Sequence, residues 1–517
     1  MTDRIGRWFP PLAVGLVAFS AARVAMLPGL GFWDTAELQT VAPVLGTAHP
    51  TGFPTYVLLG WLANLILAPF GEPALRMNLF AGLCVAVAAA VTVDLVRALT
   101  RSVALGVLAG VGLALTEIAW SIGTQAEAHA LHLAFVAILL RTLVAWEERA
   151  ERGDRHRDRW LIMAAAVFGL AMGNHSLTLL LAPAVGLFVF AVEPGIVRRP
   201  RLVVACAIAL IVTVVAVYLE LPLRAGPFRA PLVYGRPETW DGFWYVALAE
   251  QFRGSVNGPF SELGPKAAEL VARTARAFGP LAIVIPLAFV ATALSRPRYA
   301  VLSGSALAIT CFFAASYINA DIERYYLGPA LIVWTWLAIL AGGAASLVSA
   351  RLDGRAGAGA DPGNGMGRAV RVDHGIAVAL AVALLVPTIA ALPERLRRVD
   401  RSRDTLAREW VDRALARLAP DAIVVSWWSY STPLWYAQHV EGRRPDIAII
   451  DDRTRLDEHL GELTDVIDAN LSSRPVYVIR NDPSEISALE RRYVLEPLDG
   501  VTGASLSRVV ARREAGS

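Results

Sequence analysis

The sequence predicts a polytopic α-helical membrane protein with a C-terminal α/β domain. Of its 517 residues, 55% are hydrophobic and 18% are charged, and the mean hydropathy is +0.49. A soluble chain of this length needs more polar surface to stay in solution. The hydrophobic residues also form runs of roughly twenty, the helix length that spans a bilayer core. The chain is therefore expected to cross a membrane many times.

Eleven transmembrane helices are predicted from these runs. They are expected at 10–28, 76–98, 103–122, 127–145, 160–173, 175–192, 202–221, 277–294, 299–317, 326–349 and 375–392. The apolar segment 53–70 is bracketed by prolines, and we expect it to lie in the outer membrane interface. With the N-terminus in the cytoplasm and 53–70 not crossing, the arginine-rich loops fall on the cytoplasmic side, as the positive-inside rule requires.

The chain is expected to divide into two domains. The transmembrane domain covers 1–395, with outer loops at 29–75 and 222–276. The region 396–517 contains short apolar runs such as IVVSW, IAIID and VYVIR, which alternate with helix-like stretches. This alternation is typical of an α/β domain with a mostly parallel sheet. Because eleven crossings precede it, the domain is expected to be extracytoplasmic.

Two carboxylates follow the first predicted span, on the outer side. Ionisable groups beside apolar runs are costly to bury and therefore point to a functional site. The stretch WDTAE places Asp34 and Glu37 three residues apart, on one face of a helix. A carboxylate just outside the bilayer can act as a general base toward a hydroxyl. The alternative is structural, since Asp34 as N-cap and Glu37 at the third helical position would form a capping box.

Histidines and a third carboxylate lie on the same side. His49 opens the turn HPTGFP, where it either binds a phosphate or holds the loop. The stretch QAEAHALH puts Glu127 and His129 at a helix start, but without the closed spacing of a metal site, so the indication of a divalent ion is weak. Asn174 and His175 lie in GNHS between two spans, where a polar residue can simply cap a helix.

Two arginines complete this outer set. Arg224 follows the seventh predicted span, and Arg324 precedes the tenth. Arginine binds phosphate through paired hydrogen bonds, although both positions also suit interfacial anchoring. Carboxylates, histidines and arginines that converge on one membrane face suit a phosphate-bearing lipid substrate. No nucleic-acid partner is expected, and the three cysteines lie inside apolar runs, which predicts neither disulfides nor a thiolate metal site.

The motifs in this order resemble the integral-membrane glycosyltransferases of the GT-C superfamily. The resemblance is to the transmembrane O-mannosyltransferase family, including its bacterial members. It is carried by WDTAEL, GTAHPTGFPTY, EPALRMNLFAGL, QAEAHALH, GLAMGNHS and YLELPLRA. It is strong over about 30–225 and weaker through ERYYLGP. The later stretch AIVVSWWSYSTPLWYAQHVEGRRPD is similar to the family's C-terminal segment.

This resemblance implies an inverting transfer on the outer face of a bacterial cell membrane. The donor would be a polyprenyl-phosphate sugar, with mannose favoured, and the acceptor a hydroxyl of a protein or a glycan. Membrane lipid is the other partner, no further cofactor is expected, and a divalent metal is left open. The implied roles are a catalytic base at Asp34 with Glu37, donor-phosphate ligands at His49, Arg224 and Arg324, and pocket residues at Glu127, His129, Asn174 and His175. Because Thr35 and Ala36 separate Glu37 from Asp34, the role of Glu37 is the least defined.

Two other classes of protein remain as alternatives. A transporter or flippase of a lipid-linked sugar would place charges near the bilayer midplane and show repeat symmetry, which the sequence lacks. A non-catalytic scaffold that presents 396–517 would not need Asp34, His49 and Arg224 on one face. Four aromatic residues of that region offer a stacking surface, and core packing is expected for at least two of them. They are Trp427, Trp428, Trp435 and Tyr436.

Overall fold

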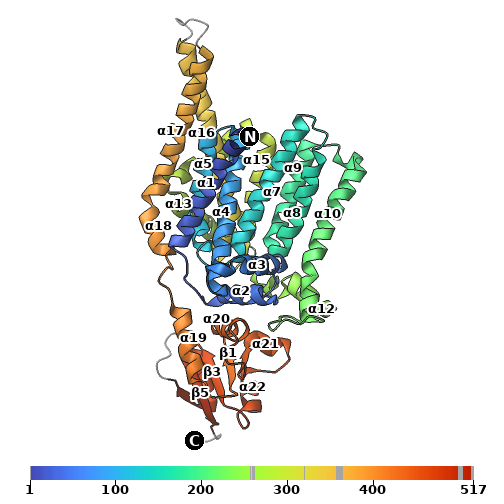
Figure 1. Ribbon diagram of the computed structural model, residues 1–517, viewed down its shortest axis with the longest axis vertical. Helices are drawn as coiled ribbons and strands as arrows, with labels where there is room; N and C mark the ends of the chain where they lie inside the picture. Colours follow the sequence, from blue (N-terminus) through green and yellow to red (C-terminus); the bar gives the residue numbers. More distant parts are fainter. Residues whose placement is uncertain are drawn as a thin grey trace.

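Long helices run side by side in a bundle, and a smaller α/β domain is attached to one end of it (Figure 1). The computed structural model describes residues 2–256, 258, 262–318, 321–356, 365–498 and 505–513. The chain begins near the end of the bundle that is remote from the α/β domain, and it ends at the far side of that domain. We call the end of the bundle that contacts the α/β domain the domain-facing end.

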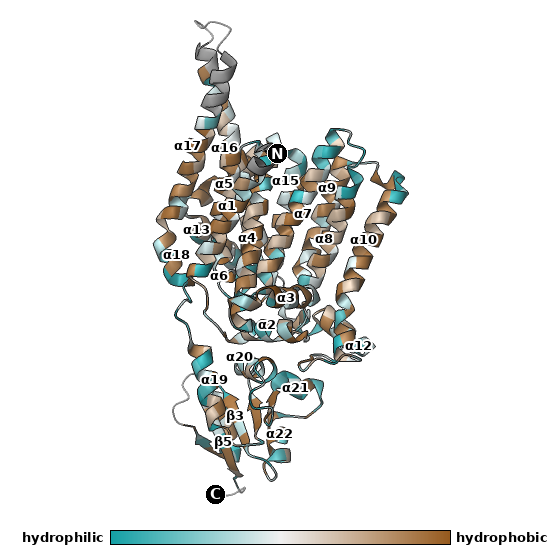
Figure 2. Ribbon diagram, in the orientation of Figure 1, coloured by the Kyte–Doolittle hydropathy of each residue, from teal (hydrophilic) through white to brown (hydrophobic). Residues whose placement is uncertain are grey.

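The bundle helices are apolar along most of their length, and their polar residues gather mainly at the two ends (Figure 2). A helix suits this environment because its backbone hydrogen bonds are satisfied within the segment. The helices are α1 (Thr2–Val24), α4 (Pro73–Thr100), α5 (Val103–Ala114), α6 (Glu117–Ile122), α7 (Ala128–Glu151), α8 (Asp158–Asn174), α9 (Ala182–Val192), α10 (Pro200–Tyr218), α11 (Glu220–Ala225), α13 (Leu263–Phe278), α14 (Ile285–Ser295), α15 (Pro297–Ser316), α16 (Leu327–Ala356), α17 (Gly365–Ala390) and α18 (Leu392–Val399).

These helices make a polytopic membrane protein, but they do not confirm eleven spans. Within the described residues, six helical segments are long and apolar enough to cross a membrane, or seven if the bent pair α17 and α18 is one span. Other predicted spans are interrupted. The span predicted at 103–122 breaks at Thr116 into α5 and α6, and the one at 175–192 starts as the 3-10 segment η2 (Ser176–Leu181) before α9.

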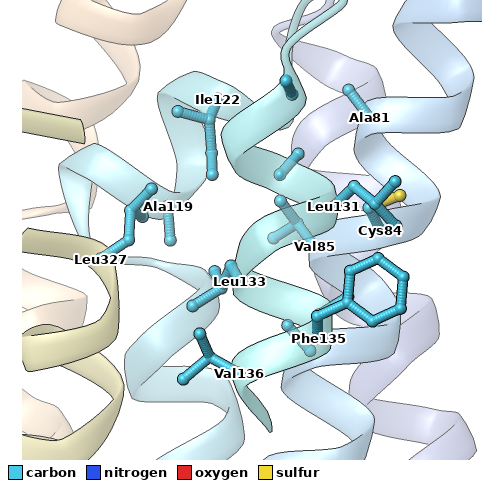
Figure 3. Close-up of a cluster of buried hydrophobic side chains, with 14 of the residues drawn as sticks. Ala81, Cys84, Val85, Ala119, Ile122, Leu131, Leu133, Phe135, Val136 and Leu327 are labelled. Atoms are coloured by element: carbon cyan, nitrogen blue, oxygen red, sulfur yellow. The ribbon is translucent and has the colours of Figure 1, made fainter. Parts of the chain in front are cut away.

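Helix α7 runs through the middle of the bundle. Its most apolar window is 89% buried, whereas that of the span containing α10 is 11% buried and faces outward. Figure 3 shows Leu131 and Phe135 of α7 beside Cys84 of α4. In a bilayer, close packing of this kind holds helices together. The start of α7 is thereby fixed at the centre of the domain-facing end.

Two short helices lie across the domain-facing end, between the bundle and the α/β domain (Figure 1). They are α2 (Trp33–Val44) and α3 (Pro54–Ile66). Together with the short η1 (Ala68–Phe70), α3 occupies the segment that was expected to lie in the interface. The first outer loop is therefore a folded layer, and α2 is its buried part.

Asp34 is a first-turn residue of α2 and does not cap it. Phe32 occupies the N-cap position, and no side-chain hydrogen bond closes this end of the helix. Trp33 starts α2 with a φ of 57°, which is uncommon for a bulky residue. The capping box that was the structural alternative for Asp34 and Glu37 is not formed, so both carboxylates have other partners.

A five-stranded sheet in the order β2-β1-β3-β5-β4 forms the core of the α/β domain. Its elements are α19 (Leu406–Arg417), β1 (Ile423–Ser426), α20 (Trp428–Trp435), β2 (Ala448–Asp451), α21 (Asp452–Asp457), α22 (Leu463–Asn470), β3 (Val476–Arg480), α23 (Pro483–Arg492), β4 (Tyr493–Pro497) and β5 (Ser505–Arg512). Strands β1, β2 and β3 are parallel, whereas β5 is antiparallel to β3 and β4. Helix α20 follows β1 directly and packs on α2.

Candidate active site

A cavity of about 340 Å³ opens at the domain-facing end of the bundle. Segments far apart in the sequence line it: α2, the turn before α3, the start of α7, η2, the loop 248–256 and the region between α15 and α16. Its ionisable wall residues include Asp34, His49, Glu127, His129, His175, Arg253, Asp321 and Arg324. Six of the nine residues predicted for the site therefore share one cavity, and Glu37, Arg224 and Asn174 lie behind its wall.

Arg324 joins three carboxylates at the centre of this cavity. It lies in η7 (Ile322–Tyr326), just before α16. Its Nη1 is 2.9 Å from Glu127 Oε2 and 3.7 Å from Asp34 Oδ2, and its Nη2 is 3.1 Å from Asp321 Oδ2. The contact with Asp34 is the longest of the three. An anion that enters the cavity can therefore replace it at the lowest cost.

Glu37 and His49 form a buried ion pair behind Asp34. His49 Nδ1 lies 2.5 Å from Glu37 Oε2, and the backbone N–H of His49 donates to Glu37 Oε1 at 2.6 Å. Burial alone would lower the pKa of His49, but the charge and hydrogen bond of Glu37, with the charge of Asp34, raise it to about 9. The pair both holds the turn and places an imidazolium in the cavity wall, so the two readings of His49 are compatible.

Asp34, Glu37 and His49 are also close enough together to be considered as metal ligands. One potential ligand atom from each lies within 4.8 Å of the others. A metal binds the neutral imidazole, however, and the raised pKa keeps His49 protonated at neutral pH. A divalent cation at this trio would therefore have to displace the proton that Glu37 holds on His49.

Glu127 is the N-cap of α7 and contacts both Arg324 and His129. Its Oε1 accepts from the backbone N–H of His129 at 3.2 Å and lies 2.8 Å from His129 Nδ1. Burial would raise the pKa of Glu127, but Arg324 and His129 lower it to about 2. The rings of His129 and His175 lie with their centroids 4.5 Å apart and their planes tilted by 49°. The Glu-His pattern at this helix start is thus both a cap and a cavity wall.

The structure places Arg224 and Asn174 outside the cavity. Arg224, on α11, donates through Nε to Leu45 O at 2.9 Å and through Nη2 to Val44 O at 3.0 Å. These carbonyls end α2, where a cation is favoured by the helix dipole. Asn174 donates to Ala128 O at 3.1 Å and ties the end of α8 to the start of α7. The predicted phosphate-binding role of Arg224 would require it to leave α2.

The α/β domain contributes a residue that the sequence did not assign to the site. Trp428 donates through Nε1 to Asp34 Oδ1 at 3.3 Å. The sequence shows two adjacent tryptophans after a short predicted strand, but only the tertiary structure shows that one of them contacts Asp34. Trp435 and Tyr436 are 3% and 0% exposed and belong to the core, as expected for at least two of the four aromatics.

A second cavity adjoins the first. It has a volume of about 420 Å³ and shares Glu127, Asp321 and Arg324 with it. Helices α13, α15 and α16 supply mostly apolar side chains to its walls, and its charged wall residues include Arg273, Arg276, Arg398 and Arg401. Arg324 therefore stands between two cavities whose walls both combine charged and apolar side chains.

Two groups of solved structures have a similar fold. The apo structure of ArnT from Cupriavidus metallidurans superposes with a TM-score of 0.58 at 15% identity, covering 98% of both chains. The same enzyme bound to undecaprenyl phosphate gives 0.56, over 97% of this chain and 98% of that chain. The Archaeoglobus fulgidus oligosaccharyltransferase in complex with Zn and sulfate gives 0.52 at 12% identity, over 95% of this chain and 73% of that one.

Sequence comparison gives matches to protein O-mannosyltransferases. Residues 34–195 match the family described as "Protein O-mannosyl-transferase TMEM260 N-terminal domain". The mouse Protein O-mannosyl-transferase TMEM260 is 28% identical over an alignment of 480 residues, and the match covers 86% of this chain. The chain spans 63% of the length of that relative. The resemblance predicted from the motif order is confirmed: the chain is an integral membrane protein that is similar in sequence to protein O-mannosyltransferases and in fold to ArnT.

Proposed function

We propose that the protein is a glycosyltransferase that moves a sugar from a polyprenyl-phosphate donor to a hydroxyl acceptor. The observation that carries this proposal is the pairing of Asp34 with Arg324 in one cavity, with Oδ2 and Nη1 3.7 Å apart. The transfer needs a base beside the acceptor hydroxyl and a cation beside the leaving phosphate, and these two groups lie on either side of a single sugar residue. The name of the mouse relative supports mannose, and the undecaprenyl phosphate bound to ArnT supports the donor class.

The proposed reaction is a single in-line displacement. Asp34 takes the proton of the acceptor hydroxyl, and the acceptor oxygen attacks the anomeric carbon of the sugar. The bond from that carbon to the phosphate oxygen breaks, and polyprenyl phosphate leaves with the electron pair. Arg324 and the His49 imidazolium stabilise the charge that develops on this phosphate, which is expected to be the largest catalytic contribution. The configuration at the anomeric carbon is inverted.

The two cavities suggest where the donor lies. We place the phosphate at Arg324, and the first isoprene units along the apolar side chains that α13, α15 and α16 give to the second cavity. The sugar then points into the first cavity, which Glu127, His129 and His175 help to line. Asp34 is 35% exposed on its side chain, so an acceptor can reach it. A protein or glycan acceptor approaches beneath the α/β domain.

The proposed orientation puts this site outside the cytoplasm. The arginine-rich loops support a cytoplasmic N-terminus, and the chain starts at the end of the bundle opposite the α/β domain (Figure 1). The site and the α/β domain then face the outer side, where no nucleotide sugar is present. A lipid-linked donor fits that compartment, because its sugar is activated by the phosphate it carries.

The decisive experiment measures donor turnover by purified protein in nanodiscs. A panel of polyprenyl-phosphate sugars is supplied with a membrane-protein extract as the source of acceptor, and released polyprenyl phosphate is measured. Turnover of one donor is expected, with a loss of at least 100-fold in Asp34→Asn. Asp241→Asn is the matched control, because Asp241 is an exposed first-turn aspartate of α12 (Trp240–Ala247).

Each other outcome has a defined meaning. Turnover that survives Asp34→Asn removes Asp34 as the base. Donor binding without turnover, together with movement of the lipid between leaflets, would favour the transporter alternative. A parallel reaction with a chelator tests metal dependence, and activity lost with the chelator and restored by one metal would assign that metal to the reaction.

A further inference from the structure

The α/β domain reaches the candidate active site through α20. This helix packs on α2, and the indole Nε1–H of Trp428 donates to Asp34 Oδ1 at 3.3 Å. The two residues are 394 positions apart in the chain. A side chain of the α/β domain is thus in direct contact with the carboxylate that we propose as the general base.

Trp428 is held in place from several sides. Its ring lies 5.6 Å from Tyr234 and 5.9 Å from Trp435, and it meets the His49 ring edge to face at 5.8 Å. The guanidinium of Arg453 lies 6.0 Å from its ring centroid. These neighbours come from both domains, so the indole can rotate only if the domain contact loosens. A fixed N–H donor is the result.

The start of α2 is held by the same domain. Trp33, whose φ is positive, packs edge to face on Trp427 with ring centroids 5.0 Å apart, and Phe32 packs on Tyr430 at 5.4 Å. An uncommon backbone conformation persists where its surroundings enforce it. The residue that follows Trp33 is Asp34. The α/β domain therefore fixes both the backbone and the carboxylate at this position.

The two oxygens of Asp34 have different partners. Oδ1 accepts from Trp428, and Oδ2 faces Arg324 across 3.7 Å. Other charged or titratable groups near this carboxylate are the His49 imidazole, the Glu37 carboxylate one helical turn away, and the Tyr325 hydroxyl. The hydrogen bond to Oδ1 opposes rotation of the carboxylate and so favours the orientation in which Oδ2 faces Arg324.

We propose that Trp428 is a positioning residue, which orients Asp34 for proton transfer so that the α/β domain completes the active site. This inference rests on the proposed role of Asp34 as the base. Without the donor, the orientation of Asp34 becomes less favourable for proton transfer.

The test replaces Trp428 with Phe, which keeps an aromatic ring and removes the N–H. We expect kcat to fall about tenfold at neutral pH and donor KM to stay within about twofold. The acid limb of the pH–rate profile is expected to move upward by about one pH unit, because one hydrogen bond to a charged group is lost. Activity is then partly recovered at higher pH.

The matched control is Trp410→Phe. Trp410 is a buried tryptophan of α19 that also packs against Phe32, but its Nε1 has no hydrogen-bond partner among the described residues. Its replacement imposes a similar packing loss on the same domain contact and should leave the acid limb in place. Trp435→Phe, which loosens the wall behind Trp428, should move the limb in the same direction by less. That variant keeps the test open if Trp428→Phe does not fold.

An equal loss at every pH, with the limb unmoved in both Trp428→Phe and Trp435→Phe, would overturn the inference. Trp428 would then be a packing residue. The outcome is separable from failure of the proposed function, because Asp34→Asn reports on that function alone. An inactive Asp34→Asn with an unmoved limb in Trp428→Phe rejects only the positioning role.

Discussion

Glu37→Gln is expected to destabilise the protein at pH 6 and to have little effect above pH 9. Gln keeps the size of the side chain and an oxygen that can accept from the backbone N–H of His49. It removes the negative charge that lies 2.5 Å from His49 Nδ1. Glu37 is fully buried, so solvent screens this charge only weakly. The substitution therefore isolates the electrostatic part of the pair.

The magnitude follows from the pKa of His49. Glu37 and Asp34 raise it from 6.5 to about 9 against the opposing effect of burial. Each pH unit corresponds to about 1.4 kcal/mol, so the protonated pair stabilises the folded state by on the order of 3 kcal/mol. Because the pKa is raised on folding, this stabilisation is complete below about pH 6.5. It declines as the pH rises and is lost through about pH 9.

Thermal unfolding in detergent at a series of pH values measures this directly. The midpoint of Glu37→Gln is expected to lie several degrees below that of the wild type at pH 6, and the difference should shrink toward pH 9.5. Glu496→Gln, at an exposed position of β4, controls for the loss of a surface charge. A midpoint difference that stays constant from pH 6 to pH 9.5 would refute the ion pair as its cause.

Three further substitutions test the contacts around the cavity. Arg224→Ala removes two hydrogen bonds to α2 and should lower the stability by about 2 kcal/mol, measured as the unfolding midpoint. The donor KM should not change. A raised KM at normal stability would instead support phosphate binding by Arg224. Arg324→Gln should raise donor KM and lower kcat at least tenfold, and unchanged initial rates would contradict its phosphate role. Tyr436→Phe removes the acceptor of the Ala74 N–H, 3.0 Å away, and should cost about 1 kcal/mol in the midpoint assay with turnover retained.

The hydropathy of the sequence predicted where the apolar helices lie, but it did not predict the points at which they break. Hydropathy locates the apolar segments, but it does not show that α5 ends at Ala114 and that Thr116 caps a separate short helix. Nor does it distinguish the 3-10 segment η2 from a transmembrane helix. In both places the backbone leaves the α conformation although the composition remains apolar. Membrane-span counts from hydropathy are least reliable at such breaks.

For the candidate site, the sequence predicted which side chains lie on one membrane face but not which groups they contact. Asp34, His49, Glu127 and Arg324 could be placed on one membrane face from arginine distribution and motif order. Which groups they would pair with could not be read from spacing. Arg224 illustrates this, because its guanidinium binds the carbonyls that end α2 rather than facing the cavity. Its partner is about 180 residues away in the chain.

The charges of the site are paired among themselves, and this has a consequence for how a donor binds. Glu37 neutralises His49, and Glu127 and Asp321 hold Arg324 at 2.9 and 3.1 Å. An anionic donor that binds at Arg324 does so by exchange, and the longest contact to exchange is the one between Arg324 and Asp34 at 3.7 Å. A phosphate that takes Arg324 from Asp34 leaves the carboxylate with Trp428 and without its cation, so that it can accept the proton of an acceptor hydroxyl. Donor binding and activation of the base would thus be one event, and an acceptor that arrives first would meet a carboxylate still paired with arginine.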